Sequence, residues 1–278
     1  MKTRILTSIV AICILLPVLY FSETAALPAA IALVAVISIY EMLGCIGVKK
    51  LYISLPIYAA ASAMPFLLRY VGDGHVFATV AFAIAAVILI YLFAVSVLSH
   101  GKFTFPALGS VFTSSAYIIA AYSAIIYIRD FGDHGKYLYL LVFIGAWVTD
   151  TFAYFTGMLL GKHKLIPDVS PKKTVEGSIG GTLFCAVAFV VFGIIMNTWF
   201  GTDANFLLLA IGGVFIAVIA QIGDLIMSVI KRHYGIKDYG KIFPGHGGML
   251  DRFDSVLIVS LGLAVMCMLV SLFDIKLL

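Results

Sequence analysis

Residues 76–98 read VFATVAFAIAAVILIYLFAVSVL, a continuous apolar run with no charged side chain. A transmembrane α-helix needs about 20 such residues to cross the hydrocarbon core of a bilayer, so this run is long enough to span a membrane. The rest of the chain has the same character. Of its 278 residues, 63% are hydrophobic and 12% are charged, and the mean hydropathy is +1.12. Soluble domains carry about 25% charged residues, so the composition excludes a soluble protein and predicts an integral membrane protein.

Nine apolar segments of this kind follow one another along the chain, joined mostly by short polar connections. They are continuous runs of helical length, whereas a membrane β-barrel has strands of about ten residues with alternating polarity. We therefore predict an all-α fold, a polytopic bundle of about nine transmembrane helices. The segments span residues 5–21, 27–47, 51–70, 76–98, 107–128, 137–160, 179–200, 206–230 and 255–274.

The first segment also has features of a signal peptide, because Lys2 and Arg4 precede it and Ala25 and Ala26 follow it. Its apolar run is longer than the usual h-region of about 7–15 residues. We interpret it as an uncleaved first span, and cleavage after the run stays open as an alternative.

The positions of the basic residues predict the topology, because connections rich in Lys and Arg stay in the cytoplasm. With the N-terminus in the cytoplasm and nine spans, only four of the 18 basic residues fall on the outer side. We therefore predict a cytoplasmic N-terminus and a C-terminus outside. The two long connections, residues 161–178 and 231–254, then both lie on the cytoplasmic side, and long loops are where function concentrates. The four outer residues are Arg69, Arg129, Lys136 and Lys276.

The chain is predicted to be a single membrane domain, residues 1–278. Within it, the helices of residues 1–135 show little that is chemically specific. The helices of residues 136–278 carry both long connections and most of the polar motifs.

The connection from Lys231 to Asp254 holds a dense group of cations next to a stretch with little side-chain bulk. Backbone N–H groups of Pro244-Gly245-His246-Gly247-Gly248 can approach phosphate oxygens closely, because the glycines lack a Cβ. Cations beside such a loop suit a polyphosphate or an anionic lipid headgroup. The cations are Lys231, Arg232, Lys237, Lys241 and Arg252.

Three carboxylates flank this connection. Asp224 lies within the preceding apolar segment, while Asp251 and Asp254 are three residues apart at the start of the last segment and share one helical face. Magnesium is typically held by one or two carboxylates together with substrate phosphates. Carboxylates beside cations at a membrane surface therefore predict metal-assisted phosphoryl or nucleotidyl transfer.

Two further acidic residues, Glu41 and Asp150, lie within apolar segments. Carboxylates there usually face a polar interior, so Asp150 is a candidate site residue or a carboxylate satisfied by its neighbours. For Glu41 we expect the side chain to extend toward Lys49 or Lys50 at the membrane surface.

The other long connection contains Ser170-Pro171-Lys172-Lys173-Thr174-Val175-Glu176-Gly177. Ser170 followed by Pro171 predicts an N-cap with proline at the first helical position. Lys172 and Lys173 either bind phosphate or fix the topology, and composition alone favours neither.

The residues from Ser228 to Asp254 resemble the signature of the phosphatidate cytidylyltransferases, also called CDP-diacylglycerol synthases. The signature contains Lys-Arg, Lys-Asp, His-Gly-Gly and Asp-Arg-apolar-Asp at fixed spacings, and the chain matches it throughout. The stretches 147–154 and 170–177 are also similar to the family. The resemblance is strong over the C-terminal half and only general over the first four spans.

The resemblance implies transfer of CMP from CTP to phosphatidate, which yields CDP-diacylglycerol and pyrophosphate. It implies Mg²⁺, a monovalent cation such as K⁺, and a homodimer in a bacterial cytoplasmic membrane with the active site facing the cytoplasm. The expected partners are therefore CTP, phosphatidate and membrane lipid, with no nucleic acid.

Residue roles follow from the resemblance together with the chemistry of the side chains. Asp224, Asp251 and Asp254 are expected to bind metal, with the first two the firmest ligands. His246 is expected to position CTP phosphates or to help pyrophosphate leave, while other catalytic residues neutralise phosphates. Those are Lys231, Arg232, Lys237 and Arg252. The expected substrate-binding residues are Ser228, Lys172, Lys173, Gly247, Gly248 and Asp150.

Two other classes of membrane protein fit the sequence less well. A CDP-alcohol phosphatidyltransferase would carry an Asp-Gly…Ala-Arg…Gly…Asp…Asp signature, which the chain lacks. A cation-coupled transporter would use Glu41, Asp150 and Asp224 and would show inverted repeats with broken helices in both halves. The concentration of polar residues in one half argues against a transporter.

Overall fold

The computed structural model describes residues 13–245 and 247–278. Eight helices in this part of the chain are long and apolar enough to cross a membrane, which confirms the all-α polytopic fold. The first predicted segment, residues 5–21, begins outside the described residues, and its described part is helical over 13–20. The long helices are α2 (Ala26–Ile46), α3 (Leu51–Val71), α4 (Gly74–Leu98), α5 (Phe105–Arg129), α7 (Leu140–Leu160, after the short α6, Gly135–Leu138), α8 (Val175–Phe200), α9 (Phe206–His233) and α10 (Leu250–Leu272).

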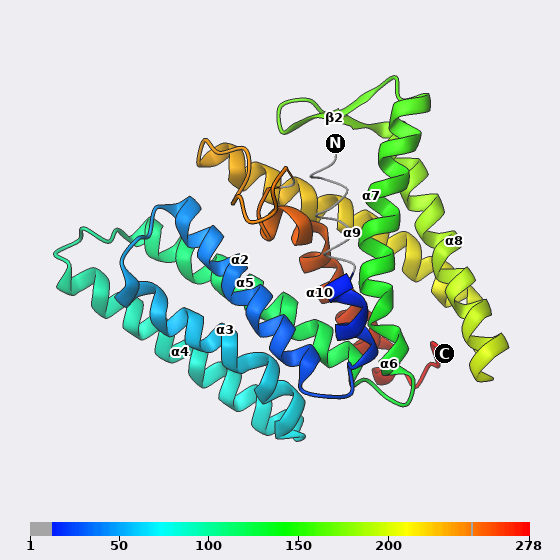
Figure 1. Ribbon diagram of the computed structural model, residues 1–278, viewed down its shortest axis with the longest axis horizontal. Coiled ribbons are helices and arrows are strands. Elements are labelled where there is room, and N and C mark those ends of the chain that lie inside the picture. The colour runs from blue at the N-terminus through cyan, green and yellow to red at the C-terminus, as the bar shows by residue number, and fades with distance from the viewer. Residues whose placement is uncertain (1–12, 246) are drawn as a thin grey trace. The chain divides into compact units, whose positions relative to one another are not determined.

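The helices divide into two compact units. The first unit comprises Met1–Tyr127 and Tyr234–Phe253, so it joins the N-terminal helices to most of the second long connection. Here α2 packs on α3 and α3 packs on α4 (Figure 1). Apolar side chains such as Ile39 and Ile57 are fully buried. A buried hydrogen bond of 2.9 Å joins the hydroxyls of Ser38 on α2 and Tyr122 on α5.

The second unit comprises Ile128–His233 and Asp254–Leu278. Its helices α7 and α8 approach closely at glycines, as small residues allow in membranes. A Cβ on Gly177 would lie 2.5 Å from the carbonyl oxygen of Ala153, and one on Gly181 would lie 2.7 Å from that of Thr149. The same occurs between α8 and α9, where a Cβ on Gly213 would lie 2.7 Å from Cα of Ala186. Glycine therefore sets the spacing of these three helices.

A two-stranded antiparallel hairpin links α7 to α8 (Figure 1). Its strands are β1 (Lys164–Ile166) and β2 (Ser170–Thr174), with Lys164 opposite Thr174. The prediction of a helix N-cap at Ser170 is therefore wrong. The N-cap of α8 is Thr174, whose hydroxyl accepts a hydrogen bond from the N–H of Gly177 at 3.1 Å. The backbone from Ser170 to Thr174 pairs with strand β1. The helix therefore begins later than the Ser-Pro sequence predicts.

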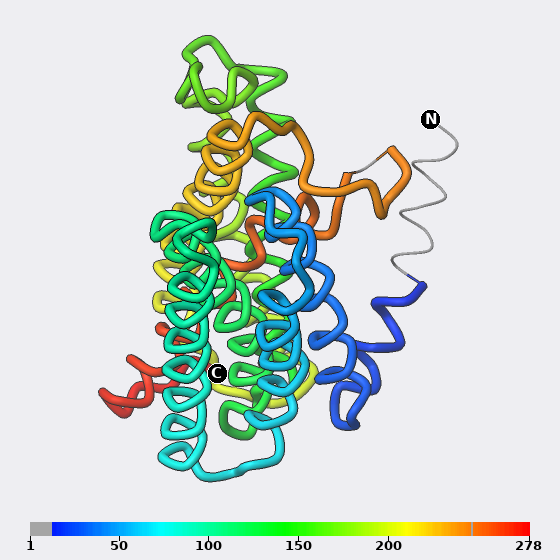
Figure 2. Tube along the Cα trace, turned by 90° about the vertical axis from the view of Figure 1, so that its left-hand side faces the viewer, coloured from blue at the N-terminus to red at the C-terminus, as the bar shows by residue number. Residues whose placement is uncertain are grey.

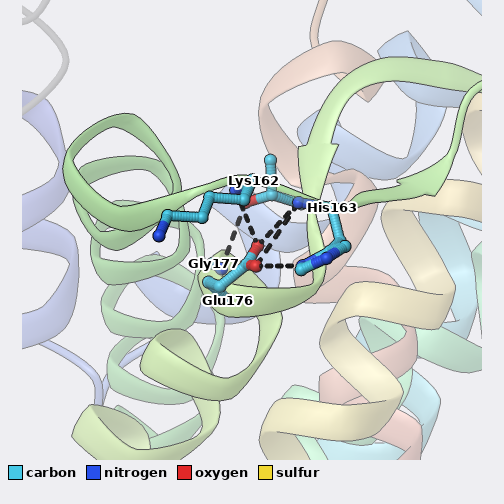
Figure 3. A network of polar contacts seen from close by, with 5 residues as sticks. Lys162, His163, Glu176 and Gly177 are labelled. Carbon is cyan, nitrogen blue, oxygen red and sulfur yellow. Dashed lines mark hydrogen bonds and ion pairs between the residues drawn. The ribbon is translucent and has the colours of Figure 1, made fainter.

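Glu176, in the first turn of α8, fixes the base of this hairpin (Figure 3). Its carboxylate accepts the backbone N–H of Lys162 at 3.1 Å and that of His163 at 3.2 Å. The Nδ1 atom of His163 lies 2.6 Å from Oε1 of the same carboxylate. One acidic side chain therefore ties the start of the hairpin to the helix that follows it.

Candidate active site

The connection before α10 is organised by the side chain of Asp251. Its Oδ2 atom accepts hydrogen bonds from the backbone N–H of Tyr239 at 2.8 Å and of Gly248 at 2.9 Å. Asp251 thereby joins two points of the chain nine residues apart and closes residues 239–248 into a loop. We call residues 237–249 the phosphate loop, because the sequence predicts that this segment binds phosphate.

Glycines allow the phosphate loop to turn this tightly. Gly245 and Gly247 have φ values of +78° and +85°, a region that side chains with a Cβ rarely adopt. Phe243 donates its N–H to the carbonyl of Gly247 at 2.9 Å. A Cβ on Gly247 would also lie 2.9 Å from Oδ2 of Asp251. His246, predicted to act on CTP, lies outside the described residues.

A pocket of about 480 Å³ opens on the phosphate loop. Its size falls within the range of about 300–1,000 Å³ that is common for small-molecule sites. Three predicted cationic residues, Lys237, Lys241 and Arg252, contribute to its wall, and all three are exposed. The full lining is Lys237, Asp238, Gly240, Lys241, Phe243, Pro244, Gly245, Gly247 and Arg252.

Glu41 on α2 contacts the end of this loop, which Figure 2 shows in orange beside the blue α2. Its Oε1 and Oε2 atoms accept the backbone N–H of Met249 and Leu250, each at 2.9 Å. The residue is 4% exposed, so the expectation that Glu41 extends toward Lys49 or Lys50 is wrong. The first N–H groups of a helix have no partner within it, and the carboxylate satisfies two of them at the start of α10.

The second unit gathers a different set of predicted residues. The ammonium group of Lys173, on β2, lies 2.5 Å from Oδ2 of Asp224 on α9. Asp150, on α7, accepts a hydrogen bond of 2.8 Å from the hydroxyl of Ser255. Asp254 interacts electrostatically with both Asp150 and Asp224. We call Asp150, Asp224 and Asp254 the acidic cluster, and Lys173 is its paired cation.

The remaining predicted residues have less defined surroundings. Ser228 is half-buried on α9, and Lys231 and Arg232 lie in the last turn of that helix. Lys231 interacts electrostatically with Asp254. Lys172 is exposed on β2, next to the half-buried Lys173. The two adjacent lysines therefore differ in the structure, because Lys173 pairs with Asp224 and Lys172 is exposed. The sequence alone offers no reason to distinguish them.

The predicted metal ligands do not form a preassembled site in the structure. Within the residues that it describes, no group of three or more His, Cys, Asp and Glu side chains is arranged to hold a metal ion. Asp224 and Asp254 belong to the second unit and Asp251 to the first, and one oxygen of Asp251 already accepts two backbone N–H groups. The set of three ligands therefore stays a prediction.

The sequence of the chain matches a known protein family and several curated bacterial proteins. The sequence profile described as "Cytidylyltransferase family" matches residues 2–270. The chain belongs to this family. The match extends over the first four helices as well as the C-terminal signature, so the family membership covers nearly the whole chain and agrees with the resemblance seen in residues 228–254.

Curated relatives of this family member come from several bacteria. The chain is 37% identical over 259 residues to a protein of Staphylococcus haemolyticus, covering 93% of this chain and 96% of the relative. It is 35% identical over 268 residues to one of Bacillus subtilis, covering 93% and 94%. It is 34% identical over 266 residues to one of Staphylococcus aureus, covering 93% and 96%. All three relatives are named phosphatidate cytidylyltransferase.

Sequence reasoning missed the contribution of two acidic residues. Glu41 carried a visible signal, an acidic residue in an apolar segment, but its partner Met249 lies 208 residues away. Glu176 carried a weaker signal, because an acid in the first turn of a helix is common. Its bonds to Lys162 and His163 become apparent only once the hairpin is formed.

Proposed function

We propose that this protein transfers the cytidylyl group of CTP to phosphatidate, which yields CDP-diacylglycerol and pyrophosphate. The proposal is supported by the family membership and by the names of relatives that match over almost their whole length. The structural observation that carries it is the phosphate loop, because the pocket on this loop has three cations in its wall. A polyphosphate such as CTP matches that charge.

The reaction needs positioning and charge neutralisation rather than a protein nucleophile. A phosphate oxygen of phosphatidate attacks the α-phosphorus of CTP and forms a new P–O bond. The bond from that phosphorus to the bridging oxygen breaks, and its electrons leave with pyrophosphate. Both substrates are polyanions, so cations that hold them together lower the barrier. We assign Lys237, Lys241 and Arg252, which line the pocket, to binding the phosphates of CTP.

The glycines of the loop contribute mainly space. The N–H of Gly248 donates to Asp251, and the next two N–H groups donate to Glu41. These three N–H groups are therefore engaged within the chain. Gly245 and Gly247, with positive φ, let the loop fold around the pocket that they line.

A divalent cation near the acidic cluster is proposed from the chemistry of the donors, since the described residues show no arranged group of three metal ligands. Asp150, Asp224 and Asp254 bring three carboxylates into electrostatic contact, and Lys173 offsets only one negative charge. Carboxylate oxygens are preferred ligands of Mg²⁺, and the proposed ligands are Asp224, Asp251 and Asp254. Bound Mg²⁺ would neutralise charge on the transferred phosphate. A monovalent cation such as K⁺ in the same region, and a homodimer, are part of the proposal through the resemblance.

We place the phosphate loop and the hairpin on the cytoplasmic side of a bacterial cytoplasmic membrane. The support is the distribution of basic residues, which predicts a cytoplasmic N-terminus and an external C-terminus. CTP is a cytoplasmic nucleotide, so this orientation gives the pocket access to its substrate. Phosphatidate would arrive from the membrane in which the helices lie.

The test is conversion of labelled phosphatidate by the purified full-length protein with CTP and Mg²⁺. The decisive variant is Lys237→Gln, which removes one cation from the pocket wall. Its matched control is Lys102→Gln, an exposed lysine of the same unit outside the pocket. We expect CDP-diacylglycerol from the wild type and the control, and a KM for CTP raised about tenfold in Lys237→Gln. Absence of product from the folded wild type would refute the function.

A further inference from the structure

We infer that Glu41, in the N-terminal half of the chain, is a positioning residue for the nucleotide pocket. Its side chain is absent from the pocket lining, and among the lining residues it lies against the backbone of Gly240. It acts through the backbone of the phosphate loop. The inference rests on the proposed function for its kinetic test, and a second measurement does not depend on activity.

The first support is the pair of hydrogen bonds to Met249 and Leu250, both 2.9 Å long. Each carboxylate oxygen serves one N–H, and both acceptors are buried. A charged acceptor strengthens such a bond, and burial makes its loss expensive. The end of the phosphate loop is therefore fixed to α2.

The second support is the close approach of two glycines to the same carboxylate. A Cβ added to Gly240 or to Gly248 would collide with Oε1 of Glu41. Gly240 lies in the first part of the phosphate loop and lines the pocket, while Gly248 lies at its end. Both parts of the loop therefore contact the side chain of Glu41. These glycines provide room for Glu41, a use that the sequence pattern alone did not suggest.

The third support is that the carboxylates of Asp251 and Glu41 bind different parts of the loop. Asp251 joins Tyr239 to Gly248 and so closes the loop on itself. Glu41 takes the next two N–H groups and so fastens the closed loop to the helical bundle of its unit. Three consecutive N–H groups, 248 to 250, therefore point at carboxylates. Loss of Glu41 is expected to leave the loop closed but free to shift, together with the cations in the pocket wall.

A purely structural role and a positioning role predict different results. If Glu41 only stabilised the fold, its loss would lower thermal stability and leave CTP binding unchanged in the molecules that remain folded. If it positions the pocket, CTP binding weakens at temperatures where the protein is fully folded. In kinetic terms, the KM for CTP rises more than kcat falls.

The experiment compares Glu41→Gln with Ser38→Ala in the full-length protein. An amide has one acceptor oxygen, so Glu41→Gln leaves Met249 or Leu250 without its partner. Ser38 lies one turn earlier on α2 and bonds to Tyr122 instead of the loop, so Ser38→Ala removes a buried hydrogen bond elsewhere in the same unit. We expect Glu41→Gln to raise the KM for CTP about tenfold, and Ser38→Ala to leave it unchanged.

Trypsin provides the measurement that does not depend on activity. Cleavage after Lys237 and Lys241, both exposed, reports the freedom of the phosphate loop. We expect faster cleavage in Glu41→Gln and the wild-type rate in Ser38→Ala. Wild-type KM and wild-type cleavage in Glu41→Gln would overturn the inference, and so would equal changes in both variants. A wild type that makes no CDP-diacylglycerol refutes the proposed function, whereas the cleavage comparison still decides the role of Glu41.

A second variant keeps the test decisive should Glu41→Gln fail to fold. Glu41→Asp retains the charge and shortens the side chain by one methylene, so its carboxylate reaches the two N–H groups less well. We expect a smaller rise in the KM for CTP and a smaller rise in the cleavage rate, both in the same direction. Wild-type values of both quantities in Glu41→Asp would also overturn the inference.

Discussion

Lys173 and Asp224 form an ion pair, with the ammonium nitrogen 2.5 Å from Oδ2 of the carboxylate. Their side chains are 23% and 25% exposed, so the pair is largely removed from water. Asp224 also interacts electrostatically with Asp150 and Asp254. Lys173 therefore offsets part of the negative charge of the acidic cluster, and Lys231 adds to this through Asp254.

Replacing this lysine should destabilise the protein. Lys173→Met keeps most of the side-chain length but leaves Asp224 beside two other carboxylates. We expect the free energy of unfolding to fall by about 1–3 kcal/mol, between the values for exposed and buried pairs. Thermal unfolding in detergent measures the change. Lys172→Met is the matched control, because Lys172 is the exposed neighbour on the same strand. Equal losses in both variants would argue against the pair.

The same variant tests the proposed binding of Mg²⁺. Without the ammonium group, the acidic cluster has more uncompensated charge, so a bound divalent cation should stabilise it more. We expect added Mg²⁺ to raise the melting temperature of Lys173→Met more than that of the wild type. EDTA should remove the difference. Identical shifts in the two proteins would contradict a metal site that includes Asp224.

Asp251 should be needed for both the shape of the phosphate loop and turnover. Asp251→Ala removes the acceptor of the Tyr239 and Gly248 N–H groups, and it also removes a proposed metal ligand. We expect turnover to fall by about 100-fold or more, together with faster tryptic cleavage after Lys237 and Lys241. Asp203→Asn, at an exposed acid outside both the pocket and the acidic cluster, controls for the loss of one negative charge. Wild-type cleavage in Asp251→Ala would show that the loop does not depend on this carboxylate.

The helix contacts in the second unit should be intolerant of a single methyl group. In Gly181→Ala the new Cβ would lie 2.7 Å from the carbonyl oxygen of Thr149 and 3.0 Å from Cβ of Ala153, so α7 and α8 must move apart. We expect a loss of about 1–3 kcal/mol in unfolding free energy. Gly44→Ala is the control, because Gly44 is also helical but has no atom within 4 Å of its Cβ position. It should be neutral or slightly stabilising.

The predicted topology can be tested by reporter fusions at the C-terminus. With nine spans and a cytoplasmic N-terminus, alkaline phosphatase fused after the last residue should be active and green fluorescent protein should be dark. The opposite pair of results would mean that residues 5–21 do not span the membrane or that the whole orientation is reversed. A tag at the N-terminus separates these two explanations, because it would be cytoplasmic in the first case and external in the second.

The sequence predicted the membrane helices well because their signal is local. An apolar run of sufficient length specifies a span by itself, so residues 51–70 were predicted and Leu51–Val71 is helical. The hairpin was missed because its signal is not local. Strand β2 forms because Lys164 pairs with Thr174, and no short stretch around Ser170 and Pro171 specifies that pairing.

The site was predictable in its chemistry but only partly in its arrangement. The signature from Ser228 to Asp254 identified the cations and glycines that surround the pocket, since these residues lie close together in sequence. It could not separate Lys172 from Lys173, because the difference depends on which one reaches Asp224. It also could not assign Glu41, whose carboxylate bonds to a loop 208 residues later.

The hydrogen bond between Glu41 and Met249 also has a consequence for the folding of the chain during synthesis and for the folding of its fragments. Helix α2 is synthesised long before the phosphate loop, so the acceptor is in place when the last connection emerges from the ribosome. A fragment that begins at residue 136 would contain the whole signature yet lack this acceptor, so the N–H groups of Met249 and Leu250 would lose the carboxylate to which they donate. Such a fragment would gain its loop geometry only when co-expressed with the helices that precede it.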